Sequence, residues 1–347
     1  MSSNDKPTVL IVGAGLGGLI FGALLEKQGL PYAIPLEYTY RQGPSSAMSV
    51  GPVLLPIFQL LGIYDEFLTI GKYVTHAGVF KETLKPYKPN DYSPIEEYLQ
   101  SLLFLKQIPS HKIQIHFGHR VLNITEEDYK VTVHLSNNDT FVGDIIVGAD
   151  GAYSAVRRRM YEQLKAKGLL PTSDQEDLPF SVTCLVGQTK VLDPEEYPII
   201  KEPTSQFYAV LGDGKPYTWT IFTTAQNTIC FMLKLRLDPQ GSYFQSHVGG
   251  EVFKTWHSGR FVLLGDACHK LHQSGGHGAV TAIHDAIALA YLVYAMPSKT
   301  SSDFTKIFEE YQSERYPAVM DSSKNSQVMS KATQRGLVLA KLVKFRP

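Results

Sequence analysis

The sequence predicts an α/β fold of two domains, of which the second is smaller and mostly β. Three observations support this prediction: short, wholly apolar runs typical of buried parallel strands, a glycine-rich turn between the first such run and a helix, and a later block of short strand-like segments. With 347 residues, the chain has the length of about two domains.

The first element is a strand followed by a glycine turn and a helix. Residues 8–12 are a continuous apolar run, Gly13, Gly15 and Gly18 follow it, and residues 19–28 have the pattern of a helix. In such a GxGxxG turn, glycine permits the tight bend and lets backbone N–H groups approach a pyrophosphate at the positive end of the helix. The segment therefore indicates the start of a βαβ unit.

An acidic residue stands at the distance that a dinucleotide site requires. Glu37 lies 19 residues after Gly18, at the end of a strand predicted over residues 32–37, where an acid binds an adenosine ribose hydroxyl. Turn and acid together favour a Rossmann-like dinucleotide-binding domain over a glycine turn with an unrelated surface glutamate. This pattern does not separate NAD from FAD.

The remaining elements follow from periodicity and turn residues. We expect a helix over residues 53–61 and an apolar parallel-type strand over residues 144–147. Between them a small antiparallel meander is predicted over residues 112–117, 120–125 and 130–135. The mostly β block is predicted over residues 180–188, 206–211, 218–224 and 228–235. The chain then returns to a buried strand over residues 261–265 and a long helix over residues 278–296.

Composition excludes several classes of partner. Lys plus Arg and Asp plus Glu both number 33, and this zero net charge argues against nucleic acid as the main partner. Cys184, Cys230 and Cys268 are odd in number and far apart, so they predict neither a disulfide framework nor a cysteine metal pair. We therefore expect a cytoplasmic protein without a bound metal.

Three segments bear on membranes. Residues 9–25 are apolar but contain five glycines, and residues 278–296 carry His284 and Asp285 in their middle, where an isolated buried charge would be costly. Both therefore predict soluble core and no integral membrane span. Residues 331–346 place basic residues among Leu and Val at near-helical spacing, which is typical of an ordinary terminal helix or of weak docking on a membrane surface.

Two further motifs follow the glycine turn. Residues 148–157 read GADGAYSAVR, and residues 265–269 read GDACH, with GGHG at residues 275–278 and Asp285-Ala286 after them. In this order and at these distances the three motifs resemble those of the class A FAD-dependent monooxygenases, the aromatic hydroxylase family. Residues 46–52 and 265–270 are most similar to fungal secondary-metabolite members.

The resemblance implies a set of cofactor contacts. Gly13, Gly15 and Gly18 would hold the FAD pyrophosphate, and Glu37 would bind its adenosine ribose. Asp150 and Gly151 belong to the second motif, in which Asp150 would help order the pyrophosphate region. Arg157 would brace that segment.

The third motif would contact the other end of the cofactor. Asp266 would accept from a ribityl hydroxyl, or reach the pyrophosphate through a water. The backbone N–H groups from Gly276 through Gly278 to Ala279 would face the flavin pyrimidine edge. A helix N-terminus at this place would also stabilise the negative charge of reduced flavin by about 0.3–2 kcal/mol.

The implied activity uses NADH or NADPH and O2 to hydroxylate or epoxidise an apolar or aromatic small molecule, with the chemistry carried by the flavin and no catalytic side chain assigned. The alternatives are a non-oxygenating flavin oxidoreductase and a catalytically degenerate binding protein of the same fold. Tyr161 and Lys165 form the YxxxK of short-chain dehydrogenases, but the glycine spacing differs, and one face of a surface helix also explains the pair.

We expect a discontinuous FAD-binding domain over residues 1–75, 111–185 and 255–330. Residues 76–110 and 186–254 would be substrate-side segments, and residues 331–347 a C-terminal helix or tail. Between the strand that ends near residue 237 and residues 253–256, the family usually inserts many tens of residues, whereas this chain has roughly a dozen. Either a small substrate domain is retained, or the gene model skips an exon.

Overall fold

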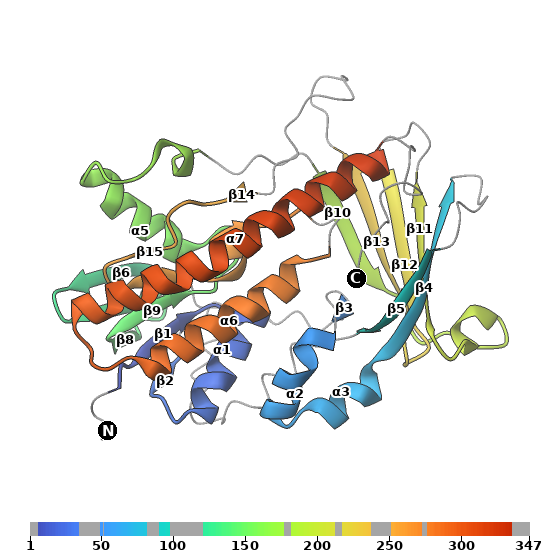
Figure 1. Ribbon diagram of the computed structural model, residues 1–347, viewed down its shortest axis with the longest axis horizontal. Helices are drawn as coiled ribbons and strands as arrows, with labels where there is room; N and C mark the ends of the chain where they lie inside the picture. Colours follow the sequence, from blue (N-terminus) through green and yellow to red (C-terminus); the bar gives the residue numbers. More distant parts are fainter. Residues whose placement is uncertain are drawn as a thin grey trace. The chain divides into compact units, whose positions relative to one another are not determined.

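The computed structural model describes residues 6–34, 49–50, 52–81, 90–97, 121–176, 182–211, 217–236, 251–272 and 276–334. The chain forms two compact units, each made of three separate segments (Figure 1). The first is Met1–Tyr40, Ser101–Asp177 and Gly250–Lys324, and the second is Arg41–Gln100, Leu178–Gly249 and Asn325–Pro347. The predicted division by ligand stays a prediction, because compactness does not test what each part binds.

The first unit is built on a five-stranded sheet. Its strands, in spatial order, are β15 (His257–Ser258), β16 (Phe261–Leu263), β9 (Ile145–Gly148), β1 (Val9–Val12) and β2 (Tyr32–Ala33). The last four are parallel, and only β15 is antiparallel to its neighbour. Every residue of β1, β9 and β16 is buried, which explains their wholly apolar sequences and confirms the three predicted parallel strands.

Four helices have most or all of their residues in the first unit: α1 (Leu16–Lys27), α5 (Ala155–Ala166), α6 (Gly278–Ala295) and α7 (Ser301–Gln334). Helices α1 and α6 pack side by side (Figure 1). Helix α1 begins three residues before the predicted start, because Gly15 is its N-cap residue and Gly18 already belongs to it. It ends at Lys27, and Gly29 leaves it with a φ of 67°.

The predicted meander is present as β6 (Val121–Glu127), β7 (Lys130–Leu135) and β8 (Thr140–Gly143). Strand β6 extends through Glu127, which pairs with Lys130, so the turn is shorter than predicted. The strand predicted over residues 112–117 lies outside the described residues. A two-stranded ladder joins β14 (Glu251–Val252) to β17 (His269–Lys270), and 3-10 helices cover Thr172–Asp174 and Gly265–Ala267.

The second unit contains a seven-stranded sheet. Its strands, in spatial order, are β10 (Val182–Gln188), β13 (Ile229–Arg236), β12 (Tyr217–Thr223), β11 (Ser205–Leu211), β4 (Lys72–Lys81), β5 (Asn90–Glu97) and β3 (Ser49–Val50). The four predicted strands of the mostly β block are confirmed. The unit also holds α2 (Leu55–Leu61), α3 (Tyr64–Ile70) and 3-10 helices at Pro52–Leu54 and Pro198–Lys201.

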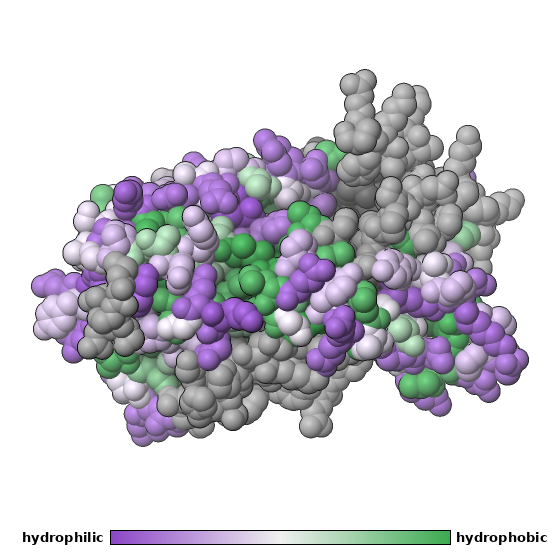
Figure 2. Space-filling view, turned by 60° about the horizontal axis from the view of Figure 1, so that its bottom comes forward, coloured by the Kyte–Doolittle hydropathy of each residue, from purple (hydrophilic) through white to green (hydrophobic). Residues whose placement is uncertain are grey.

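Among the described residues, one helix, α6, is long and apolar enough to cross a membrane by length and composition alone. Asp285 in its middle is fully buried and lies 2.8 Å from Arg315, which is the character of a helix in a protein core. The described residues on the face drawn in Figure 2 mix hydrophilic and hydrophobic side chains. Residues 335–347, which include most of the predicted basic helix, lie outside the described residues.

Candidate cofactor site

Three parallel strands of the first unit bring the three motifs to one edge of the sheet. Val12 pairs with Gly148, and Gly148 pairs with Leu263, so β1, β9 and β16 end side by side. Backbone hydrogen bonds continue past the strand ends, from Ala149 to Val12 and from Leu264 to Gly148. The loops with Gly15, Asp150 and Asp266 therefore start next to one another, where parallel α/β sheets bind ligands.

The glycines of the first motif serve two different purposes. A Cβ on Gly13 would lie 2.2 Å from the carbonyl oxygen of Ala149, and one on Gly18 would lie 2.1 Å from the carbonyl oxygen of Gly13. Glycine is required at these two positions by the packing of the chain itself. A Cβ on Gly15 would have its nearest neighbour 3.9 Å away, so the structure leaves open space there.

Open space recurs at the other two motifs. A Cβ on Gly151, Gly276 or Gly278 would meet no atom within 4 Å among those that the structure describes. Gly151 and Gly276 also have positive φ angles, of 78° and 65°. The left-handed backbone favours glycine at positions 151 and 276, whereas Gly278 is required by neither packing nor a left-handed φ and fits close approach of a ligand to the backbone.

Two of the nearby helix N-termini have no side-chain cap. Gly15 at the start of α1 and His277 at the start of α6 cap no backbone group with a side chain, and neither first turn contains an acidic residue. The N–H groups there carry a partial positive charge. The first turns of the two helices that the resemblance assigns to a negatively charged cofactor thus contain no carboxylate of their own.

The Asp150 carboxylate accepts hydrogen bonds at the start of α5, whose N-cap residue is Ser154, through only one of its two oxygens. Its Oδ2 accepts from the backbone N–H of Ala155 at 2.6 Å and of Val156 at 3.3 Å, and Ser154 accepts from Arg157 N at 2.9 Å. Its Oδ1 is buried and has no hydrogen-bond partner among the described residues. Burial raises the pKa of Asp150, and the hydrogen bonds to its carboxylate counter part of that shift. A ligand donor at this place would satisfy Oδ1.

Arg157 links the second motif to the third. Its guanidinium is buried and donates to the carbonyl of Ala152 at 2.6 Å and of Ala267 at 2.7 Å. Its Cζ also lies 4.4 Å from the centroid of the Phe253 ring. The bond to Ala267 joins two segments that are distant in the sequence, whereas the role of Arg157 at a cofactor site stays a prediction.

Asp266 lies in the 3-10 helix that follows β16. Burial raises the pKa of its carboxyl group, while His269 and Lys270 nearby lower it. A carboxyl group whose pKa is shifted by burial and by nearby charged residues is a candidate for a functional site. Glu37, the last predicted cofactor contact, lies outside the described residues.

Sequence reasoning was wrong about Tyr161 and missed one buried residue. Tyr161 is 8% exposed, not on a surface face, and its hydroxyl donates to the carbonyl of Thr255 at 2.9 Å. Burial and Asp174 raise its pKa, which opposes the acid role of a YxxxK pair.

The sequence did not predict Arg315 of α7, which pairs with Asp285. The signal that could have indicated it was that a buried Asp285 needs a cationic partner.

Comparisons with known proteins agree with this geometry. The family model described as "FAD binding domain" matches residues 6–326, so the chain belongs to this family of FAD-binding proteins. The FAD-dependent monooxygenase cle3 of Aspergillus versicolor is 25% identical over 390 residues, covering 96% of this chain and 78% of that protein. The FAD-dependent monooxygenase ptmM of Penicillium ochrochloron is 26% identical over 389 residues, covering 94% and 89%.

The fold is also found among solved structures. CtdE in complex with FAD and its substrate 4 superposes with a TM-score of 0.75 at 18% identity, covering 95% of this chain and 90% of that one.

The alignment with cle3 spans 390 residues, more than the 347 of this chain, so cle3 contains residues that have no counterpart here. This agrees with a shortened chain, whereas the predicted place of the shortening, residues 237–256, stays a prediction.

Proposed function

We propose that this protein is an FAD-dependent monooxygenase that uses NADH or NADPH and O2 to hydroxylate or epoxidise an apolar or aromatic small molecule. One oxygen atom of O2 enters the substrate, the other leaves as water, and NAD(P)H supplies the two electrons. The observation that carries the proposal is the convergence of three motifs, with unfilled glycine positions, at one edge of the parallel sheet. The monooxygenase names of cle3 and ptmM support the reaction class.

The residues at the sheet edge suit the parts of FAD. Gly13, Gly15 and Gly18 would place the N-terminus of α1 at the pyrophosphate, with Asp150 beside it, and Glu37 would bind the adenosine ribose. Bound FAD would supply the redox chemistry, accepting a hydride and activating O2.

At the flavin end, Asp266 would hold the ribityl chain. Gly276, Gly278 and Ala279 would offer backbone N–H groups at the start of α6, where a partial positive charge stabilises an anion. In the second motif, Gly151 would keep the backbone close to the cofactor, and Arg157 would keep the second and third motifs in register.

We also propose that the protein is cytoplasmic and that residues 331–346 dock weakly on a membrane surface. The odd number and wide spacing of Cys184, Cys230 and Cys268 in the sequence support a reducing compartment.

The test is a turnover assay on purified protein supplied with FAD. We expect NAD(P)H oxidation to accelerate with a productive substrate, and one atom of 18O from labelled O2 to appear in the product by mass spectrometry. A dehydrogenated or cyclised product without 18O would favour the non-oxygenating oxidoreductase. A preparation that remains colourless after FAD is added would instead favour the degenerate binding protein.

A further inference from the structure

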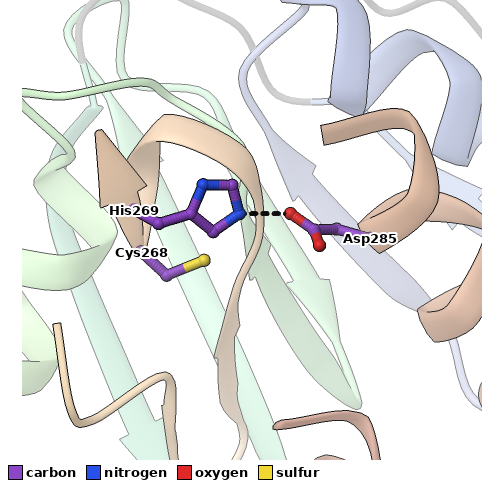
Figure 3. Close-up of side chains that lie close together, drawn as sticks. All are labelled: Cys268, His269 and Asp285. Atoms are coloured by element: carbon purple, nitrogen blue, oxygen red, sulfur yellow. Dashed lines mark hydrogen bonds and ion pairs between the residues drawn. The ribbon is translucent and has the colours of Figure 1, made fainter. Parts of the chain in front are cut away.

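A buried charged cluster lies behind the third motif, within the first unit. His269 of β17 and Asp285 of α6 point toward each other, with Cys268 beside them (Figure 3). The His269 Nε2 lies 2.5 Å from Asp285 Oδ2, and Arg315 Nε of α7 lies 2.8 Å from Asp285 Oδ1. His269 and Asp285 are fully buried, and Arg315 is 8% exposed. Such a cluster is costly to bury.

The cluster does not suit a metal ion. The ligand atoms of Cys268, His269 and Asp285 lie within 4.8 Å of one another. However, both Asp285 oxygens already accept hydrogen bonds, and the Arg315 guanidinium would repel a cation. Burial raises the pKa of the Cys268 thiol well above its ordinary value, and a metal binds the thiolate form.

Asp285 reaches the third motif through a backbone bond. Its Oδ2 accepts from the N–H of Gly265 at 3.1 Å. Gly265 has a φ of 61° and starts the 3-10 helix that contains Asp266. A Cβ on Gly265 would lie 3.1 Å from the Cβ of Ala282, which is also on α6, so the motif is held tightly against this helix.

The same helix carries the other half of the flavin-end contacts. Asp285 stands seven residues after Gly278, which is about two turns along α6. A bond from Asp285 to Gly265 therefore connects the loop of Asp266 to the helix whose N-terminus would face the flavin. The distance between these two cofactor contacts depends on that connection.

We propose that His269 and Asp285 are positioning residues for the cofactor: His269 orients the Asp285 carboxylate, which holds the Gly265 N–H and thereby fixes Asp266 relative to the N-terminus of α6. Arg315 completes the cluster by neutralising Asp285. The inference rests on the proposed FAD site. It assigns a role to two residues that would not touch the cofactor themselves.

Two substitutions of His269 test the role of the hydrogen-bond donor at its Nε2. The carboxylate acceptor places the ring proton on Nε2, whereas Nδ1 is buried and has no hydrogen-bond partner among the described residues. A glutamine amide donates from nearly the position of Nε2. Leucine fills a similar volume and donates nothing. His269→Gln and His269→Leu therefore form a matched pair.

The experiment compares FAD affinity with the stability of the apoprotein. We expect the FAD dissociation constant of H269L to rise about tenfold at a temperature well below its unfolding, and that of H269Q to stay within about threefold of the wild type. A merely structural role would lower the unfolding temperature of H269L and leave its FAD affinity unchanged, and that result would overturn the inference.

A measurement on the unmodified protein keeps the inference testable if H269L does not fold. We expect the amide of Gly265 to be protected from hydrogen exchange in the apoprotein, because Asp285 accepts its hydrogen bond before FAD binds. Protection that appears only after FAD is added would overturn the positioning role. Wild-type protein that binds no FAD would overturn the proposed function as well, whereas FAD binding with an unaffected H269L overturns the inference alone.

Discussion

The guanidinium of Arg157 and the carbonyl of Ala267 are joined by a 2.7 Å hydrogen bond across 110 positions of the sequence. The same side chain donates to Ala152, so one buried residue links the second and third motifs. Hydrogen bonds from a charged donor contribute about 1.5–3 kcal/mol each, and their buried acceptors are costly to leave unpaired.

Arg157→Met should therefore destabilise the protein strongly, because it keeps the bulk of the side chain and removes both donors. We expect the free energy of unfolding to fall by about 2–4 kcal/mol, measured by urea denaturation of the apoprotein. The matched control is Arg158→Met, since Arg158 is exposed in the same helix and its loss should cost less than about 0.5 kcal/mol. Equal losses in the two variants would contradict the bracing role.

Substitutions of the first-motif glycines should distinguish their effect on FAD binding from their effect on the stability of the apoprotein. Gly15→Ala adds a methyl group into open space, at a φ of −69° that alanine adopts readily, so the apoprotein should keep its stability within about 0.5 kcal/mol. FAD binding should weaken by at least about tenfold, because the methyl group would occupy the place of the pyrophosphate. Thermal unfolding and a fluorescence titration with FAD measure the two effects.

Gly13→Ala provides the contrast for Gly15→Ala. Its Cβ would collide with the Ala149 carbonyl oxygen at a φ of 113°, so the apoprotein itself should be destabilised by several kcal/mol, on the order of 2–4. If Gly15→Ala bound FAD as the wild type does, the open space at Gly15 would not be a cofactor site.

Asp266 should make the apoprotein less stable as the pH rises. Burial raises its pKa in the folded state, so the folded state binds more protons than the unfolded one above the ordinary carboxyl pKa of about 4. Its contribution to the free energy of unfolding therefore falls as the pH rises from about 4 through the raised value. Asp266→Asn removes the charge and should remove this decline.

Denaturation of the apoprotein at several pH values checks this. We expect D266N to be more stable than the wild type at neutral pH while binding FAD more weakly, the trade-off typical of a functional carboxylate. Asp321→Asn removes a largely exposed carboxylate as a control and should change neither property. A D266N protein that loses stability at neutral pH would show that the carboxylate supports the fold instead.

The sequence predicted the elements whose conformation depends on neighbouring residues, namely the buried strands and the glycine turn. The apolar runs of β1 and β9 are buried on both faces, and Gly13 and Gly18 have no room for a side chain, so the strands and the glycine turn were predicted directly. The partnership of Arg315 with Asp285 spans 30 positions and could not be found this way, because Arg315 looks like any charge on the polar face of a long helix. Only the packing of α7 shows that it is buried.

Contacts between distant residues also explain why the burial of Tyr161 and the strand β4 were not predicted. Tyr161 has the sequence context of a surface helix, but its hydroxyl partner, Thr255, lies 94 positions away. Strand β4 was not predicted, and it pairs in parallel with β11, for example Phe80 with Val210. Contacts of this range are set by the whole fold, so the sequence located the three motifs and Arg157 but not the distant partners of Tyr161 and Asp285.

In the second unit, Gly187 of β10 and Phe231 of β13 are paired across the sheet. A Cβ on Gly187 would lie 2.5 Å from Cζ of the Phe231 ring, so the ring lies across the backbone of the glycine. This arrangement is the aromatic cover of a strand glycine, which compensates for the missing side chain. The effects of substitutions at Gly187 and Phe231 on the free energy of unfolding should therefore not be additive.

Gly187→Ala should force the Phe231 ring from its position and cost about 1–3 kcal/mol of unfolding free energy, although alanine alone favours a strand over glycine. Phe231→Leu removes the outer ring atoms that the new methyl group would meet. The double variant should therefore be more stable than the sum of the two single changes indicates, by about 0.5–2 kcal/mol. Urea denaturation of all four proteins closes this double-mutant cycle. Strictly additive losses would show that the ring does not depend on the glycine, and that the sheet accommodates a side chain at position 187 by another route.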